Sequence, residues 1–488
     1  MDRRIGRRQG AVGGTLEHQA HANGGDQAVP RNERLAALMT QAGFLDRSGS
    51  IGRKRFARAV SESVAARTAG RSYSHTYVSR WINGTVPRDD STRDAIREAL
   101  GARLGRVVAA DELGFRSTTT ISPDAGLAYP DAPDDGVGSV AQLFEADLSD
   151  ATVLVQAPTN VAAWNEASVA WLVGAQRPLV DGTGPTRIGA SDVERLRAMR
   201  QTFDRLDSTF GGAHARNALV QYLRTQLPRL LRARGDSTVR RSLFSAAGES
   251  TQLAAWMAYD AGLHGLAQRY FIQALGLADA GDDRLLAASI LDAMSHQANF
   301  LGRYREAANL ARAARLGTES AGVPILTSHF HVIEARALAR TGDAEACDRA
   351  MGAAVTHFER HTSGEGPEWI GYFDAAELAA ELGHCNRDLG RPEAAIKYAT
   401  QALDSASGDY VRSDFFVAMV LADAHLDRGD VDEACRVAGH AFAVGEGLES
   451  ARCRGYVDEF RQRLMPHKSS AEVRSFVAWA RESRMWPQ

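Results

Sequence analysis

Five glycines recur at nearly regular spacing in the second half of the chain, and each stands between two apolar segments with helical periodicity. They are Gly262, Gly302, Gly342, Gly390 and Gly429, separated by 40, 40, 48 and 39 residues. Alanine or another small residue tends to follow five, nine and twelve positions later. A helix–turn–helix unit of this length cannot bury its apolar face alone, so such units must stack. The repeat therefore predicts a right-handed superhelical array of helix pairs with a concave groove.

The small-residue positions resemble those of the tetratricopeptide repeat, in which short side chains let paired helices approach closely. In the first two units they are occupied by Ala267, Phe271, Ala274, Ala307, Ala311 and Ala314. The spacing exceeds the usual repeat of about 34 residues, which implies longer helices or loops. A helical repeat of another family, with a similar architecture, is the alternative. Because no alternating strand pattern accompanies the helical one, we expect an all-α fold.

The composition divides the chain into four parts. Residues 1–30 are rich in glycine and polar side chains, so we expect a disordered N-terminus. Residues 31–115 hold short helical segments punctuated by turn residues, which is typical of a small helical domain. Residues 116–138 contain proline, glycine, aspartate and threonine without periodicity, and we interpret them as a linker. Residues 139–488 form the repeat-containing body.

A net charge of −3 conceals a split between the two ends of the chain. Residues 31–110 contain fifteen arginines and lysines against seven aspartates and glutamates, a net charge of +8, whereas the chain from residue 111 onward carries −12. A basic domain attached to an acidic body is the balance expected when one end of a protein meets a polyanion.

The segment Ser72–Pro87 predicts a short helix that starts after Ser72 or Ser74 and stops at Asn83-Gly84. At helical spacing the inward positions are Tyr77 or Val78, Trp81 and Ile82. The outward positions are His75, Thr76, Ser79 and Arg80. Arginine suits the edge of a guanine, and short hydroxyl side chains suit small polar or methyl contacts, so this face fits base edges in a major groove.

The same segment, read as V-S-R-W-x-x-G-x-x-P over residues 78–87, resembles the recognition helix of the Cro/C1-type (XRE) helix-turn-helix family. The resemblance implies a lambda-repressor-like domain that binds double-stranded DNA. Ser74 opens this helix and Asn83 ends it, where it caps or contacts a phosphate. The flanking cations expected at phosphates are Arg53, Lys54, Arg71 and Arg88.

This chain departs from the family in one spacing. Ala57 precedes Val78 by twenty-one residues, where common members have about ten. The additional residues 61–72 must lengthen the preceding helix or loop out between the two helices.

A longer resemblance covers most of the chain from about residue 33 and is strongest over residues 240–320. The segments 243–275 and 289–307 look like actinobacterial transcriptional regulators that join such a helix-turn-helix to tetratricopeptide repeats. Members of that group influence sporulation and antibiotic production, which implies a regulator of differentiation or secondary metabolism. We expect a homodimer, because one recognition helix reads only a few base pairs.

In the first helix of each repeat unit, the residues at fixed distances before the glycine are expected to point toward the concave face. The positions that we expect to line a ligand or peptide groove are Trp256, Tyr259, Asp260, Asp292, His296, Asn299, Arg336, Arg340, His384 and Arg387. An amide, a histidine, aromatics and both charge signs suit an extended signalling peptide or a small molecule. The alternative is that these side chains are solvated or bond to one another.

The sequence offers no case for an enzyme. It has no Walker loop, no dinucleotide-binding glycine fingerprint and no HExxH motif, so we expect neither catalytic residues nor a cofactor. The four cysteines are far apart in sequence and form no CxxC pair, which favours reduced thiols buried in helices over a metal site. With no apolar run long enough to span a bilayer and no secretory signal, we expect a cytoplasmic protein. The rival hypothesis is a tetratricopeptide adaptor that binds proteins and no DNA.

Overall fold

The computed structural model describes residues 32–87, 89–109, 111–115, 122–148, 152–174, 179, 182–362, 364–406 and 410–486. The expected disordered segment, residues 1–30, lies outside these ranges. Helices and turns account for the described residues, with two isolated β-bridges and no named strand among them. The all-α class is therefore confirmed. The chain divides into two compact units, residues 1–120 and 121–488.

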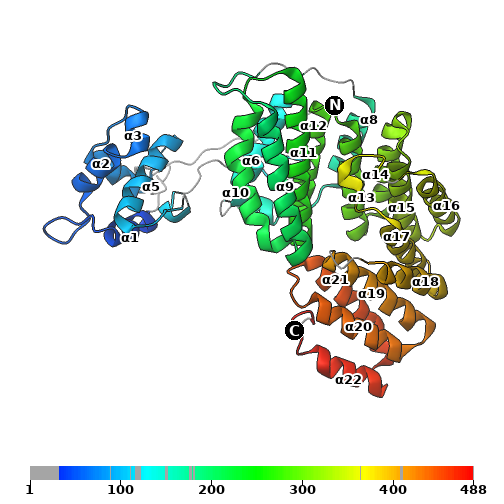
Figure 1. The fold of residues 1–488 in the computed structure, drawn as a ribbon. Coiled ribbons are helices and arrows are strands. Elements are labelled where there is room, and N and C mark those ends of the chain that lie inside the picture. The colour runs from blue at the N-terminus through cyan, green and yellow to red at the C-terminus, as the bar shows by residue number, and fades with distance from the viewer. Residues whose placement is uncertain are drawn as a thin grey trace, which may run out of the picture. The chain divides into compact units, whose positions relative to one another are not determined.

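Unit 1 is a set of short helices around one apolar core, drawn in blue in Figure 1. Its elements are α1 (Glu33–Gln41), α2 (Arg53–Ser61), α3 (Val64–Thr68), α4 (His75–Ile82), α5 (Asp90–Leu104) and the 3₁₀ turn η1 (Asp111–Leu113). Side-chain caps fix three of the starts, because Asn32, Ser63 and Asp89 accept hydrogen bonds from backbone N–H groups of α1, α3 and α5.

Unit 2 begins with five helices that precede the repeats. They are α6 (Pro133–Leu148), α7 (Thr152–Val155), α8 (Val161–Val173), α9 (Ala190–Phe210) and α10 (Gly212–Leu231). Five helix pairs follow: α11 (Ser237–Asp260) with α12 (His264–Ala280), α13 (Arg284–Phe300) with α14 (Tyr304–Thr318), α15 (Pro324–Thr341) with α16 (Ala344–Arg360), α17 (Ala375–Asp388) with α18 (Pro392–Asp404), and α19 (Val411–Arg428) with α20 (Val431–Gly445). The chain ends with α21 (Ala451–Leu464) and α22 (Ala471–Ala480), and the short turns η2 (Glu319–Ala321), η3 (Glu368–Ile370) and η4 (Met465–His467) lie between helices.

The five recurrent glycines stand at the turns inside these pairs, as the sequence predicts. Gly262, Gly302, Gly342, Gly390 and Gly429 all have positive φ, between 67° and 93°, a conformation that other residues adopt only with strain. The two helices of each pair pack against each other, and the small residues five and twelve positions after the glycines, Cys347 and otherwise alanines, are buried. Short side chains at those positions let the helix axes approach closely, which confirms the predicted helix–turn–helix units.

The first helices of the pairs form a consecutive row, in which α11 packs on α13, α13 on α15, α15 on α17 and α17 on α19. Helix α21 packs on α19 and continues the row. The last helix of the row also contacts the first. Ser450, which caps α21, donates a hydrogen bond of 2.8 Å to Asp260 at the end of α11. Arg412 of α19 bonds Asp207 of α9 at 2.8 Å and Asp260 at 3.2 Å. Buried polar bonds therefore tie the two ends of the row together.

The linker predicted over residues 116–138 is wrong in its second part. Residues 116–121 lie outside the described ranges, but the carbonyls of Pro123 and Ala125 accept hydrogen bonds from Arg269 of α12 at 2.5 and 3.1 Å. Gln273, one turn further along α12, donates to the carbonyls of Gly126 and Ala128. Helix α6 then starts at Pro133. The turn-rich stretch is thus an irregular segment bound to the body of unit 2.

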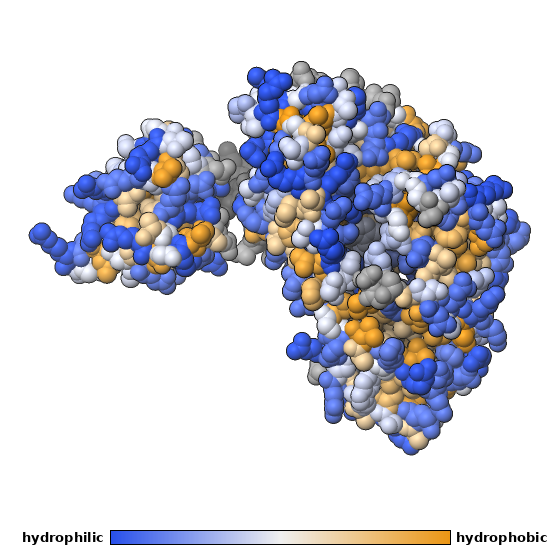
Figure 2. All heavy atoms as spheres, in the orientation of Figure 1, coloured by the Kyte–Doolittle hydropathy of each residue, from blue (hydrophilic) through white to orange (hydrophobic). Residues whose placement is uncertain are grey.

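The surface drawn in Figure 2 is mostly hydrophilic, with apolar residues in scattered patches. All four cysteines are free and buried in helices α16, α17, α20 and α21. None of the described helices combines the length and the apolarity that a bilayer span requires.

Candidate nucleic-acid interface and inner-face polar network

Helix α4 of unit 1 has the two faces that its sequence predicts. Val78, Trp81 and Ile82 are at most 3% exposed, and they belong to the core to which α2 also contributes. Tyr77, the alternative to Val78 as an inward residue, is 48% exposed and contacts the ring of Tyr73 at 5.9 Å. The apolar face therefore anchors α4 on the domain and leaves the opposite face outward.

The outward face of α4 carries most of the side chains expected to read bases. His75, Thr76 and Arg80 are exposed, as are Ser74 at the start of the helix and Asn83 at its end. Ser79 is half-buried, and its hydroxyl donates to the His75 carbonyl at 2.9 Å. The donor capacity of this hydroxyl is therefore used within the helix. Ser74 holds the N-cap position without a side-chain capping bond.

Several cations of unit 1, among them Arg53, Lys54 and Arg80, have no carboxylate partner within the described part of the chain. Arg53 and Lys54 open α2, Arg80 lies on α4, and all three are exposed. Neighbouring cations are engaged, since Arg58 pairs with Glu62 at 2.8 Å and Arg55 donates to the Leu45 carbonyl at 2.9 Å. The positive charge of Arg53, Lys54 and Arg80 is thus available to an external anion.

Arg71, expected at a phosphate, instead bonds within unit 1. Its guanidinium donates to Asp89 at 2.6 Å and to Thr92 at 3.4 Å. Burial alone would raise the pKa of Asp89, but hydrogen bonds from Ser91, Thr92 and Arg71 outweigh it and lower the pKa to about 2. Arg71 therefore joins the loop before α4 to the start of α5. Arg88 lies outside the described residues.

The additional residues between Ala57 and Val78 form a separate short helix. Helix α2 ends at Ser61, and α3 follows and packs on both α2 and α5. The backbone N–H of Ala65 donates to Glu98 of α5 at 3.0 Å, which holds α3 in place. The extra spacing is therefore absorbed between α2 and α4, and those two helices still pack on each other.

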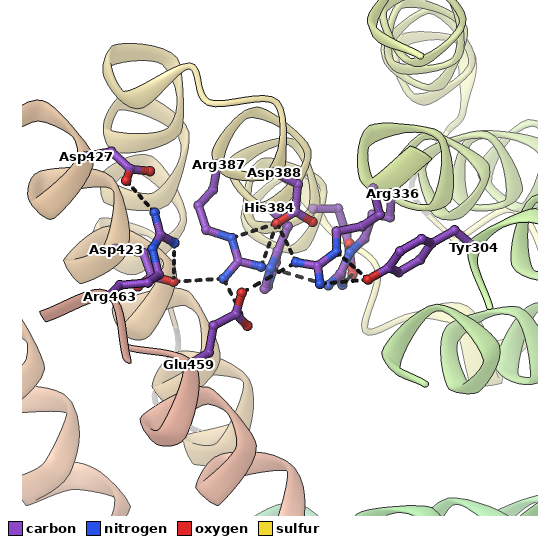
Figure 3. Close-up of polar contacts among 11 residues, drawn as sticks. Tyr304, Arg336, His384, Arg387, Asp388, Asp423, Asp427, Glu459 and Arg463 are labelled. Atoms are coloured by element: carbon purple, nitrogen blue, oxygen red, sulfur yellow. Dashed lines mark hydrogen bonds and ion pairs between the residues drawn. The ribbon is translucent and has the colours of Figure 1, made fainter. Parts of the chain in front are cut away.

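We call the side of the helix row that carries Arg336, Arg387 and Asp423 the inner face of unit 2. It holds a continuous network of charged side chains from α15, α17, α19 and α21 (Figure 3). Arg336 donates to Glu381 at 2.9 Å and contacts His384 at 3.3 Å. Arg387 bonds Asp388 and Asp423, both at 2.8 Å. Because the side chains of these six residues are nearly all buried, the pairs are desolvated and depend on one another for compensation.

A polar cavity of about 460 Å³ adjoins this network. Arg340 lies at its wall, donating to the Tyr304 hydroxyl at 2.9 Å and pairing with Asp388 at 3.4 Å and Glu459 at 3.5 Å. Arg463 closes the other side through Asp423 at 3.1 Å and through Asp427. Since it presents both charge signs, this cavity suits a small zwitterionic or mixed-charge ligand.

At the α11 and α13 end, the expected groove residues contact one another. The Tyr259 hydroxyl and His296 Nδ1 are 3.1 Å apart, and the ring of Trp256 lies 5.5 Å from that of His296. Arg452 of α21 stacks over Tyr259 at 4.8 Å. Burial, followed by the charge of Arg452, lowers the pKa of His296 well below its usual value, so this histidine is neutral.

Most of the ten expected groove residues are thus engaged, some with each other and others with neighbouring side chains of unit 2. Tyr259, Asp260, Asp292, Arg336, His384 and Arg387 are buried, and Trp256, His296, Asn299 and Arg340 are half-buried. Asp260 ties α11 to α10 and to the cap of α21. Asp292 pairs with His329 at 3.3 Å. The repeat pattern does not identify Glu459 and Arg463, because they belong to α21, which lies after the last of the five recurrent glycines. It does not identify Glu381 either, because that residue lies one helical turn before the expected position His384.

Glu377 and Glu381 place two carboxylates close together on α17. Burial, and then the charge of Glu381, raise the pKa of Glu377 to about 7, although His329 and Arg336 act in the opposite direction. Burial opposes protonation of His329, but Asp292 outweighs it and raises the pKa of that imidazole. Glu377 is therefore a carboxyl whose charge changes near neutral pH.

We expect Glu377→Gln to stabilise the protein at pH 8 and to leave it unchanged at pH 4.5. Because the folded-state pKa of about 7 exceeds the ordinary 4.5, the native state binds more protons between these values, and the wild-type free energy of unfolding falls as pH rises through this window. This difference between the two pKa values corresponds to about 3 kcal/mol of stability. Because Glu377 is partly open to solvent, we expect an effect of about 1–2 kcal/mol. Urea unfolding at both pH values measures it, with Glu345→Gln, an exposed site, as the control. If Glu377→Gln changed the free energy of unfolding equally at the two pH values, the raised pKa of Glu377 would be contradicted.

Comparison with known proteins adds one match. Residues 35–116 match the family model of the SP15 N-terminal domain, which spans α1 to α5 of unit 1. No curated protein and no solved structure matches the chain.

Proposed function

We propose that this protein is a sequence-specific DNA-binding transcription regulator. The observation that carries the proposal is α4, a short helix held by Val78, Trp81 and Ile82 that exposes Thr76 and Arg80 on its outer face. A helix with a buried anchoring side and a free arginine on the other side has the form of a major-groove reader. The resemblance of residues 78–87 to the Cro/C1-type recognition helix supports the same role.

In this proposal α2 and α4 are the two helices of a lambda-repressor-like helix-turn-helix, with α3 inserted between them. Arg53 and Lys54 at the start of α2 contact phosphates, whereas Arg71 supports the domain internally. Phosphate contacts set the position on the duplex, and α4 supplies the sequence preference.

Unit 2 is proposed to be a tetratricopeptide-like solenoid that joins two copies of the chain. A dimer would place two α4 helices on successive half-sites, which one copy cannot reach. The inner face is largely occupied by its own ion pairs, so a peptide or small effector would have to enter the mixed-charge cavity beside Arg340. Such a ligand would change regulation only by binding one dimer arrangement more tightly than another. A cytoplasmic regulator of differentiation or secondary metabolism fits this arrangement.

A salt titration of the full chain on duplex DNA tests the proposal. With Arg53 and Lys54 each neutralising one phosphate, we expect affinity to fall about 12-fold between 50 and 200 mM salt. The double variant Arg53→Gln/Lys54→Gln should remove most of this dependence. Equal affinity at both salt concentrations, or no binding to any duplex from a genomic library, would favour the adaptor without DNA binding.

A further inference from the structure

The C-terminal end of unit 2 contains a second cavity, of about 670 Å³, between α21 and α22. Its floor is apolar, because Leu464, Val473 and Trp486 line it and are at most 7% exposed. Helix α21, the turn η4, helix α22 and residues after α22 all contribute to its lining. A volume between about 300 and 1,000 Å³ with apolar walls is typical of a small-molecule site.

The rim of this cavity is purely cationic. Four lining side chains are charged, namely Arg461, Lys468, Arg474 and Arg481, and all four are exposed. No carboxylate lines the cavity, and none of these cations pairs with a carboxylate in the described part of the chain. Arg474 donates to the Ser469 carbonyl at 2.5 Å, and Arg461 lies 5.6 Å from the Trp486 ring centroid. No lining carboxylate compensates their charge, although Arg474 interacts electrostatically with Glu472, a neighbour that does not line the cavity.

This rim contrasts with the inner-face network, where almost every arginine has a carboxylate partner. Unit 2 is acidic overall, yet every charged side chain that lines this cavity is a cation. A cationic rim above an apolar pocket is complementary to a molecule with an anionic head and an aliphatic body.

We propose that this cavity binds an anionic amphiphile, a molecule with one carboxylate or phosphate head on an aliphatic chain of about ten carbons. The head would lie among Arg474, Lys468 and Arg481, and the chain would lie on Leu464, Val473 and Trp486. A single chain fits the volume of the cavity, whereas an acidic helix of a partner protein needs a face of standard interface size, about 800 Å² per partner. The site does not depend on whether unit 1 binds DNA.

The first experiment compares ligands of one chain length on the full protein by isothermal titration calorimetry, below their micellar concentrations. We expect decanoate or decyl phosphate to bind with one site per chain, and whichever binds more tightly identifies the head group. Decanol should bind at least tenfold more weakly, and decyltrimethylammonium should not bind. Each methylene added between octanoate and decanoate should raise affinity about fourfold. Equal binding of decanol and both anions, or no binding of either anion at 1 mM, would overturn the proposal.

The second experiment locates the site. Lys468→Gln/Arg474→Gln should weaken binding of the tighter anion at least tenfold, and Ala478→Glu, which places a carboxylate at an exposed lining position, should abolish it. Arg454→Gln removes an exposed arginine from α21 that does not line the cavity, and it should change nothing. Circular dichroism verifies the fold of each variant. Unchanged binding in both cavity variants, or binding of an acidic amphipathic peptide in place of the amphiphiles, would refute it.

Discussion

Replacing Arg80 by alanine is expected to remove the sequence preference of DNA binding while leaving the fold intact. A bidentate arginine–guanine contact contributes about 1–3 kcal/mol of discrimination, so affinity for the preferred site should fall about ten- to a hundredfold. Arg80 is exposed and has no carboxylate partner in the described part of the chain, so its loss leaves no buried group uncompensated. Selection of bound duplexes from a random library identifies the preferred site, and fluorescence anisotropy then measures the affinities.

Two variants separate readout from charge. Arg80→Lys keeps the positive charge but loses the planar fork, so it should retain the salt dependence and lose most of the preference. Arg58→Ala removes an arginine of α2 whose side chain is 83% exposed and paired with Glu62, and it should preserve the preferred site. If Arg80→Ala selects the same site with the same affinity ratio over random DNA, Arg80 does not read bases.

The unit 1 interface shows which contacts a sequence can predict. Helical periodicity assigns Val78, Trp81 and Ile82 to the core, because that pattern depends only on residues within one helix. It cannot reveal that Arg71 is bound by Asp89, eighteen residues away. The pairing depends on how the loop before α4 meets the start of α5, which is a tertiary relation.

The same distinction holds in unit 2. The glycine turns are local features, so their positions and the helix pairs follow directly from the repeat. The segment 122–132 has a linker-like composition, yet Arg269 and Gln273 bind its carbonyls from about 145 residues away. Likewise, the spacing before each glycine identifies residues of the inner face but not the groups to which they bond. Glu459 pairs with Arg340 across 119 residues, and no local sequence pattern predicts that α21 packs beside these helices.

The buried ion pairs of the inner face make Arg336 a sensitive position in unit 2. Its side chain is 9% exposed and bonds Glu381, whose side chain is 8% exposed. Burial opposes the charge of Arg336, but Glu381 outweighs it and raises the pKa of the guanidinium, so it remains charged. Glu377 lies in the same field, and Arg336 lowers its pKa. Removing this one cation therefore leaves the two carboxylates of Glu377 and Glu381 with His329 as their remaining compensating charge.

Arg336→Met is accordingly expected to lower the free energy of unfolding by about 3–5 kcal/mol at pH 8. The cost should shrink toward pH 5, because protonation of one carboxyl relieves the repulsion, and urea unfolding at the two pH values measures the difference. Adding Glu381→Leu should recover most of the loss, since the uncompensated charge is then gone. Arg349→Met, on the outer helix α16 with a side chain 64% exposed and paired with Glu345, should cost less than about 0.5 kcal/mol. A cost for Arg336→Met that is the same at both pH values, and that the second substitution does not relieve, would show that packing by its aliphatic stem, and not charge, holds this face together.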